Sequence, residues 1–203
     1  LGLRINEGYG LTEASPSVTV STGPDTPIGS IGKPIPGIEV RLIDDDGDDV
    51  YIGDPGELVV RSPGVFAGYL DDPEATARVL DDDGWLHTGD IAVVDDDGYL
   101  YLVDRAKDLI IVSGFNVYPA EVERVLLAHP AVAEAGVVGV PHPHTGEAVK
   151  AFVVAETGRA VEEDDLIEWA AGELARYKCP TKIDVVDEIP RGSTGKVLRR
   201  ELR

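Results

Sequence analysis

One uninterrupted stretch, residues 103–123, constrains the fold most strongly. It begins with a charged turn, continues with the apolar run 109–112, breaks at Ser113 and Gly114, and starts a helix at Pro119. A proline at the first helical position loses no hydrogen bond, and the acidic residues behind it suit the positive end of a helix. The stretch therefore predicts a strand, a glycine turn and a helix start in immediate succession.

The charge of the chain is divided unevenly along its length. Residues 1–104 hold 22 acidic and 5 basic residues, whereas residues 105–203 hold 16 acidic and 13 basic residues. Such a change in composition favours two domains that meet near residue 104. The formal net charge of −20 argues against nucleic acid as a partner, because a phosphate backbone would be repelled.

Targeting signals and disulfides are both missing from the sequence. No apolar run is long enough to cross a bilayer, and the first residues lack the basic and apolar parts of a signal peptide. The single cysteine, Cys179, excludes an internal disulfide and permits a reducing compartment. We therefore expect a soluble, cytoplasmic protein without a transmembrane segment.

The first part alternates short β-rich runs with turns. We expect strands over residues 38–43, 58–61, 91–94 and 99–103. Three Asp-Asp-Asp-Gly clusters, which end at Gly47, Gly84 and Gly98, predict turns in which glycine takes a positive φ. Calcium loops are the alternative, but the acidic residues do not have the spacing that an EF-hand requires.

The second part alternates helices and strands. Helical periodicity covers residues 119–128 and 162–176, and Trp169 is expected in the core as part of the second apolar stripe. Residues 133–140 and 148–154 read as strands. The order predicts a small α+β sandwich with its helices on one face of a sheet.

Three further motifs carry polar groups suited to ligand binding. Residues 8–13, GYGLTE, and residues 84–90, GWLHTGD, both read as loops, and an aspartate can accept two hydroxyl hydrogen bonds from a ribose. Residues 190–196, PRGSTGK, are not a Walker loop, because Pro190 and Val197 occupy positions that need glycine and a hydroxyl residue. Taken singly, each motif could equally be an ordinary turn or, for the last, a solvated basic tail.

Together with residues 103–123, these motifs occur in the order typical of one enzyme family. The chain resembles the adenylate-forming (AMP-binding) superfamily over essentially its whole length, and most closely its fatty and long-chain acyl-CoA synthetases. The resemblance implies a ligase that joins a carboxylic acid to AMP from ATP, with Mg²⁺, and then transfers the acyl group to coenzyme A (CoA).

The resemblance also assigns the nucleotide site. Tyr9 would lie against adenine, Thr12 near the α-phosphate, and Glu13 at Mg²⁺, which requires oxygen ligands. Asp90 and Arg105 would hold the ribose.

The remaining assignments fall in the second part. Lys196 matches the catalytic lysine, which would screen the repulsion between carboxylate and phosphate, and Lys107 matches the hinge position. Gly114 would face pantetheine, and Tyr177 and Lys178 would contact CoA, although a surface role is an equal alternative for the last two.

The chain departs from the family pattern at its beginning, since no phosphate loop or acyl-pocket domain precedes GYGLTE. The expected organisation is thus the β-rich, barrel-like end of a large domain (residues 1–104) and a small α+β domain (residues 105–203). A fragment of this kind should be inactive alone, and its acyl substrate cannot be deduced from it. Two alternatives are an adenylation domain that loads a carrier protein and a noncatalytic nucleotide-binding or partner-binding module.

Overall fold

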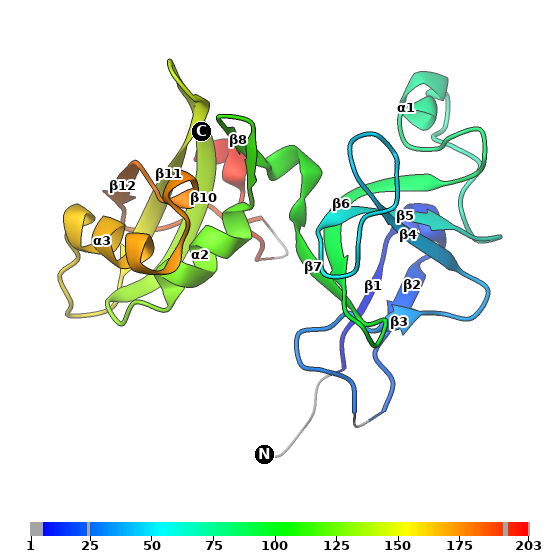
Figure 1. The fold of residues 1–203 in the computed structure, drawn as a ribbon, viewed down its shortest axis with the longest axis horizontal. Helices are drawn as coiled ribbons and strands as arrows, with labels where there is room; N and C mark the ends of the chain where they lie inside the picture. The colour runs from blue at the N-terminus through cyan, green and yellow to red at the C-terminus, as the bar shows by residue number, and fades with distance from the viewer. Residues whose placement is uncertain (1–5, 24, 193–194, 203) are drawn as a thin grey trace. The chain divides into compact units, whose positions relative to one another are not determined.

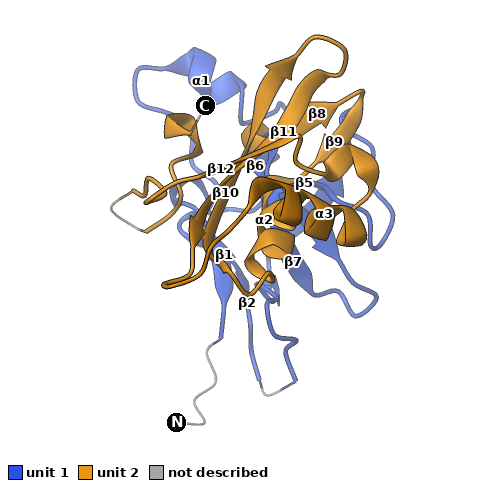
Figure 2. Ribbon diagram, turned by 90° about the vertical axis from the view of Figure 1, so that its left-hand side faces the viewer, with its two compact units in different colours: residues 1–106 blue, residues 107–203 orange. Residues whose placement is uncertain are grey.

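The chain divides into two structural units. Unit 1 comprises residues 1–106 and unit 2 comprises residues 107–203, as Figure 2 shows. The structure, a computed structural model, describes residues 6–23, 25–192 and 195–202. None of the helices in these ranges is both long and apolar enough to span a membrane.

Antiparallel strands build unit 1 (Figure 1). One sheet has three strands and the other has four, and each strand pairs with its neighbours in sequence. The strands are β1 (Gly8–Gly10), β2 (Ser17–Val20), β3 (Lys33–Pro34), β4 (Glu39–Ile43), β5 (Gly56–Arg61), β6 (Leu86–Val94) and β7 (Leu100–Arg105). A short helix, α1 (Pro73–Ala77), is capped by Asp72, whose side chain accepts a hydrogen bond from Ala75 N. The predicted β-rich character of the first part is confirmed.

Both sheets of unit 1 contribute to one apolar core. Val18 comes from the three-stranded sheet, and Leu58, Val60 and Leu86 come from the four-stranded sheet. All four side chains are at most 1% exposed. Their burial explains why the short β-branched and leucine-rich runs form strands despite the many polar turns between them.

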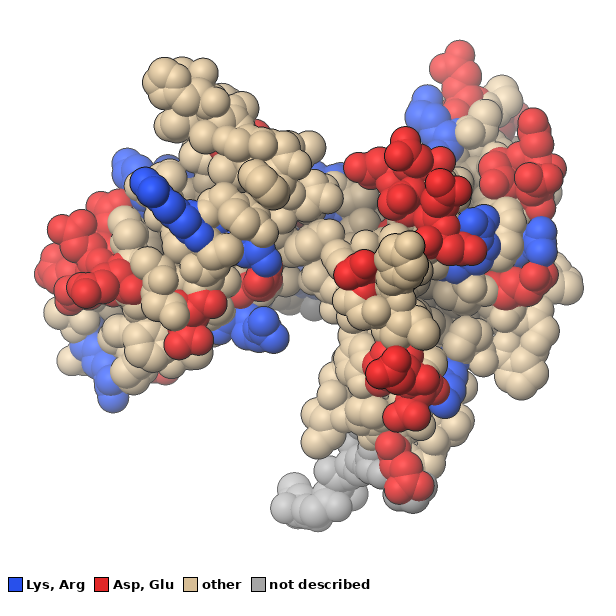
Figure 3. Space-filling model, viewed as in Figure 1, with Lys and Arg blue, Asp and Glu red and all other residues tan. Residues whose placement is uncertain are grey.

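The three aspartate clusters form turns of one design. The first aspartate of each cluster accepts two backbone N–H hydrogen bonds, as Asp44 Oδ1 does from Asp46 N and Asp48 N at 3.0 Å. Asp81 and Asp95 do the same in the other two clusters. The glycine that closes each turn has a φ between 81° and 84°, as predicted. Figure 3 shows several groups of acidic side chains on the visible surface of unit 1 and a further group on unit 2.

Unit 2 combines a five-stranded sheet with two helices (Figure 1). The strands are β8 (Ile110–Val112), β9 (Phe115–Val117), β10 (Val132–His142), β11 (Gly146–Ala155) and β12 (Lys182–Val185), and the helices are α2 (Pro119–Leu127) and α3 (Glu163–Glu173). Strand β11 runs antiparallel to β10 and β8 and parallel to β12.

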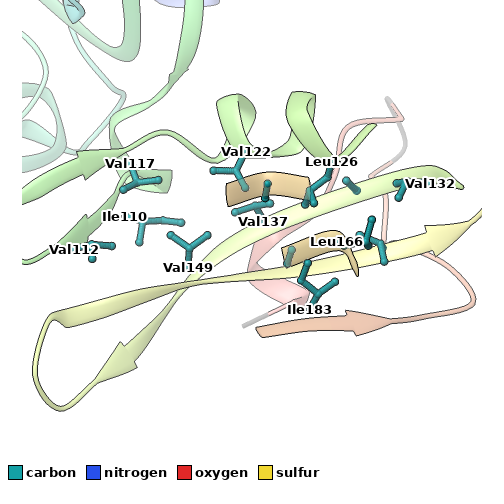
Figure 4. Close-up of a cluster of buried hydrophobic side chains, with 14 residues drawn as sticks. Ile110, Val112, Val117, Val122, Leu126, Val132, Val137, Val149, Leu166 and Ile183 are labelled. Carbon is teal, nitrogen blue, oxygen red and sulfur yellow. The ribbon is translucent and has the colours of Figure 1, made fainter. Parts of the chain in front are cut away.

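The helices pack on one face of this sheet. Val122 and Leu126 from α2 and Leu166 from α3 are fully buried, and Figure 4 shows them beside Val137 and Val149 of the sheet. The α+β architecture predicted for the second part, with a helix starting at Pro119, is therefore confirmed.

The C-terminal segment covers part of the other face. Gly136 of β10 lies under Leu202, so closely that a Cβ atom at this position would come within 2.8 Å of Leu202 Cδ1. Ile189, 5% exposed, flanks the same glycine, and its Cγ2 would lie 3.5 Å from such a Cβ atom. Glycine at this position thus permits the close approach of the segment that carries Lys196.

Two motifs predicted as loops are mostly regular structure. Residues 84–90 are not a simple loop, because β6 already begins at Leu86. Residues 8–13 form β1 and the start of the 3-10 helix Thr12–Ala14. In both cases the hydrogen-bond partners lie on another strand, distant in the sequence. The local sequence pattern therefore does not reveal that these residues form regular structure.

The second helix differs from its prediction in two respects. It ends at Glu173 instead of residue 176, because Leu174 is extended and turns the chain so that Leu174 and Tyr177 pack against the core. Trp169 is not in the core, since 37% of its surface is exposed. Its indole N–H donates to Val125 O at 2.9 Å, which fixes the ring at the surface between the two helices.

Candidate functional site

A bulge in β6 positions Asp90. Strand pairing places Val59 of β5 opposite His87 and Glu57 opposite Ile91, so that three residues of β6 lie opposite one residue of β5. Gly89, in the middle of the bulge, has a φ of 68°, a conformation that glycine adopts without strain.

Asp90 lies at the centre of a cluster of predicted ligand-binding residues. Its Oδ2 accepts a hydrogen bond of 2.6 Å from the Tyr9 hydroxyl, and its Oδ1 accepts one of 3.0 Å from Arg105 Nε. The Asp90 side chain is 13% exposed, whereas that of Arg105 is 53% exposed. Three residues that are far apart in the sequence are therefore brought together at one surface-accessible carboxylate.

The Tyr9 hydroxyl acts as a hydrogen-bond donor in this cluster. Burial raises the pKa of Tyr9 above its usual range, and the hydrogen bond to Asp90 raises it further. The protonated phenol donates to Asp90 Oδ2, and this hydrogen bond holds the tyrosine ring in one orientation beside the carboxylate.

Thr12 and Glu13 lie in the 3-10 helix that follows β1. Glu13 Oε1 accepts a hydrogen bond of 2.8 Å from the hydroxyl of Tyr69, and that bond raises the pKa of Tyr69. Phe66 N donates to Glu13 O at 2.8 Å, and the Phe66 ring packs edge-on against Tyr69. Tyr69 thus orients the Glu13 carboxylate, whereas the Thr12 side chain is exposed.

Sequence reasoning missed Glu57, Tyr69 and the structural part played by His87. Glu57 Oε1 accepts from Gly89 N at 3.0 Å, and Glu57 Oε2 lies 2.9 Å from His87 Nδ1. These partners are separated by 30 residues or more, so only the strand register could have indicated the contacts. Within the described residues, no three His, Cys, Asp or Glu side chains group as metal ligands would.

The predicted CoA residues lie around the β8–β9 hairpin of unit 2. Ser113 and Gly114 form its two-residue turn and both have positive φ. Tyr177 stacks on Phe115 of this hairpin with a centroid distance of 4.8 Å. Tyr177 is thus placed next to the Gly114 turn.

Lys178 makes a well-defined ion pair in this structure. Its ammonium lies 2.8 and 2.7 Å from the two carboxylate oxygens of Glu121, and the two side chains are 20% and 25% exposed. Any contact of Lys178 with a phosphate would therefore compete with Glu121.

Lys196 extends from a loop whose two ends approach each other. Arg191 and Val197 form a β-bridge, and Gly192 N donates to Lys196 O at 2.8 Å. Ser193 and Thr194 of the PRGSTGK motif lie outside the described residues. The Lys196 side chain is exposed and makes no hydrogen bond or ion pair with any part of the chain that the structure describes.

Arginines anchor this loop before and after Lys196. Arg191 pairs with Glu134 at 2.6 Å and donates to Gly195 O at 2.8 Å. Arg199 pairs with Glu123 of α2 at 2.8 Å and with Asp108 at 3.3 Å. The first pair is about 40% exposed, whereas the side chains of the second network are at most 18% exposed. Glu123 also accepts a hydrogen bond from the backbone N–H of β10.

Lys107, the predicted hinge residue, is exposed within the 3-10 helix Ala106–Asp108. It is the first residue of unit 2. Asp108, the next residue, belongs to the Arg199 network, so the beginning of unit 2 is tied to its C-terminal segment.

Comparison with known proteins agrees with this arrangement in both units. Residues 1–70 match the model of the AMP-binding enzyme family, and residues 121–196 match that of the AMP-binding enzyme C-terminal domain. The chain belongs to the AMP-binding enzymes. The two matched regions follow each other in the order that the resemblance predicted.

Relatives of this AMP-binding chain include a CoA ligase and a CoA synthase. It is 50% identical over its whole length to a long-chain-fatty-acid–CoA ligase of Escherichia coli O157:H7 and 46% identical to a feruloyl-CoA synthase of an Amycolatopsis species. It covers 36% and 41% of these two proteins, respectively. The chain thus spans little more than a third of the length of the curated relatives it matches.

Solved structures give the same result for the fold. The ATP-bound structure of MatB from Rhodopseudomonas palustris has a TM-score of 0.92 and is 40% identical; the match covers 100% of this chain and 40% of MatB. The o-succinylbenzoate CoA synthetase of Bacillus subtilis with its acyl-adenylate intermediate has a TM-score of 0.86 and is 37% identical; that match covers 100% of this chain and 41% of the synthetase.

Proposed function

We propose that this chain is the C-terminal part of an ATP-dependent ligase that activates a carboxylic acid as its adenylate and transfers the acyl group to CoA. The observation that carries the proposal is the Asp90 carboxylate held between Tyr9 and Arg105 in a member of this family. A fatty acid is the proposed substrate class, because relatives that are 50% identical to this chain are long-chain-fatty-acid–CoA ligases.

Asp90 is suited to hold the ribose. An ionised carboxylate has about four acceptor positions, of which the contacts with Tyr9 and Arg105 use two. The remaining lone pairs can accept hydrogen bonds from the two ribose hydroxyls, while Arg105 Nε holds Oδ1 in place. The Tyr9 ring would form one side of the adenine site.

Thr12 and Glu13 would serve the phosphates. A bound Mg²⁺ would draw charge from the phosphate oxygens, and Mg²⁺ sites of this kind use one or two carboxylates together with the substrate phosphates. Glu13 fits such a site because its carboxylate is oriented by Tyr69 and retains free lone pairs. Thr12, exposed beside it, would donate to the α-phosphate.

Lys196 would assist the adenylation step. In that step a carboxylate oxygen attacks the α-phosphorus, the bond to the β-phosphate oxygen breaks, and pyrophosphate leaves. The Lys196 ammonium would lower the repulsion between the two anions and stabilise the negative charge of the transition state. Its exposed position leaves it free to do so.

Transfer to CoA would use a different side of unit 2. The CoA sulfur attacks the acyl carbonyl, and AMP leaves with the bonding electrons. Gly114 would let pantetheine approach the backbone closely, and the stacked ring of Tyr177 beside it would contact CoA. Lys178 would contribute only by exchanging Glu121 for a phosphate.

The domain assignment is part of the proposal. Residues 1–104 would end the large AMP-binding domain and residues 105–203 would form the small one, with Lys107 as the hinge. Limited proteolysis should then cleave first near residues 104–107, and equal protection of this segment and both cores would contradict it. We also propose a cytoplasmic location, since the reaction consumes ATP and CoA.

Pyrophosphate exchange by the complete protein, measured against a panel of carboxylic acids, tests the function. We expect acid-dependent exchange that is strongest with long-chain fatty acids, followed by CoA-dependent release of AMP. Exchange without any transfer to CoA, but with transfer to a carrier protein, would favour the carrier-loading alternative. No exchange with any acid would favour a noncatalytic module. Residues 1–203 alone should not catalyse exchange.

A further inference from the structure

Glu57 combines two contacts that no other described carboxylate makes with the β6 bulge. Its side chain is 26% exposed, and its two oxygens reach two different residues of the bulge, Gly89 N at 3.0 Å and His87 Nδ1 at 2.9 Å. Because an ionised carboxylate only accepts hydrogen bonds, His87 Nδ1 carries the proton. Glu57 therefore joins β5 to Gly89, which turns the backbone, and to His87 just before it.

The bulge depends on such side-chain contacts, because its N–H groups leave the regular ladder. Gly89 N donates to Glu57, and Asp90 N donates to Thr88 Oγ1 at 3.1 Å. Thr88 Oγ1 in turn donates to Leu58 O at 2.7 Å. Three hydrogen bonds to or from side chains thus replace the missing strand contacts, and Glu57 accepts the one at the glycine whose φ is positive.

We propose that Glu57 is a positioning residue for nucleotide binding. By fixing the bulge, it sets the direction in which Asp90 leaves the strand and so keeps the carboxylate between Tyr9 and Arg105. This inference rests on the proposed function of Asp90 as the ribose ligand. Loss of Glu57 leaves the Asp90 charge in place but allows its carboxylate to move away from the ribose hydroxyls.

The test uses the complete enzyme and compares ATP with 2′,3′-dideoxy-ATP, which lacks the ribose hydroxyls. Glu57→Ala should raise the KM for ATP about tenfold and lower the preference for ATP over the dideoxy nucleotide by a similar factor, with kcat at saturating ATP little changed. Glu57→Gln keeps an acceptor for Gly89 N, and its amide N–H can donate to His87 Nδ1 once the imidazole proton lies on Nε2, so this variant should restore most of the preference. Glu39→Ala is the matched control, since Glu39 pairs with Arg61 on the neighbouring strand and is 61% exposed.

The outcomes distinguish failure of the ribose assignment of Asp90 from failure of the positioning role of Glu57. If Asp90→Ala removes the preference but Glu57→Ala keeps it, Glu57 is not a positioning residue and the ribose assignment stands. If Asp90→Ala keeps the preference, both the ribose assignment and the role of Glu57 are overturned. Should Glu57→Ala fail to fold, Glu57→Asp retains the charge, withdraws it by one methylene, and should show an intermediate loss of preference; an unchanged preference would overturn the role.

Discussion

Asp90 and Lys196, the two residues on which the proposed chemistry depends most, are held in opposite ways. The Asp90 carboxylate is 13% exposed and bonded through both oxygens, and its backbone is fixed by the bulge. The Lys196 ammonium is exposed and has no partner within the described residues, although arginines anchor its loop on both sides. One group is fixed before the ligand arrives, whereas the other is presented on a supported loop.

This difference suits two kinds of task. A residue that recognises hydroxyls gains specificity when its acceptors are already oriented, because no ordering of the side chain remains to oppose binding. A cation that acts in only one of two reaction steps must enter and leave the site. Such a movement costs less free energy if the cation has no internal ion pair to break. We therefore expect substitutions at Asp90 and its neighbours to change nucleotide affinity, and substitutions at Lys196 to change the rate of one step.

The largest expected effect is that of Lys196→Ala in the complete enzyme. Removing the ammonium should cost about 3 to 4 kcal/mol of transition-state stabilisation, or roughly several hundred-fold in the adenylation rate. Thioester formation from a supplied acyl-adenylate should be retained. Rapid-quench measurement of the two half-reactions checks this, with the exposed Arg200→Ala as control. Equal slowing of both steps would mean that Lys196 is not specific to adenylation.

The support of the Lys196 loop gives the next largest effect. Arg199→Ala removes the guanidinium that pairs with the mostly buried carboxylates of Glu123 and Asp108. Because these charges would lose their cationic partner, the C-terminal segment should be destabilised by about 2 to 3 kcal/mol. Arg191→Ala, which removes an exposed pair, should cost roughly 1 kcal/mol or less. Hydrogen–deuterium exchange of the 3-10 helix Arg199–Glu201 checks both values. Equal exchange in the two variants would show that burial does not distinguish the anchors.

Lys107→Pro tests whether the switch from adenylation, which uses Lys196, to thioester formation, which uses the Gly114 turn, requires rotation at Lys107. Proline fixes φ, so thioester formation should slow by roughly tenfold while adenylation is spared. Lys107→Ala, which keeps φ free, should spare both half-reactions. If Lys107→Pro leaves thioester formation unchanged, Lys107 is not the hinge.

Tyr9→Phe gives the smallest expected effect. The variant loses one hydrogen bond to Asp90 but keeps the ring, so the KM for ATP should rise about fivefold, equivalent to ~1 kcal/mol, with kcat unchanged. Tyr101→Phe loses a similar bond, of 3.0 Å to Asp95, outside the cluster and should not alter KM. An equal change in both variants would indicate a general loss of stability in unit 1.

Sequence reasoning found the residues with a motif and missed those without one. Tyr9, Asp90 and Arg105 were predicted to share a ligand, and the structure brings them together. Glu57 could not be found because its contact with Gly89 arises from the strand register. Tyr69 could not be found because its partner, Glu13, lies 56 residues earlier in the sequence. The roles of all these residues in binding stay predictions.

The predictions of local structure succeeded where the conformation depends on nearby residues. The aspartate turns and the helix start at Pro119 follow from backbone preferences that act within a few residues. The prediction of a loop over residues 84–90 was wrong because pairing with β5 extends the strand into this segment. The prediction that Trp169 is in the core was wrong because the packing of two helices holds its ring at the surface. Long-range contacts are what a single sequence does not reveal.

The turns of unit 1 separate surface charge from fold. In each Asp-Asp-Asp-Gly cluster the first aspartate holds the backbone, whereas the middle one, such as Asp45, Asp82 or Asp96, is exposed and bonds to no part of the turn. Substitution of the middle aspartate by lysine, serine or glutamate should therefore leave the turn and the strands on either side unchanged. The first position needs a side-chain oxygen that can accept both backbone hydrogen bonds, as asparagine also could. The acidity of this surface can thus change with the solvent in which the organism lives, without any change in the proposed nucleotide site.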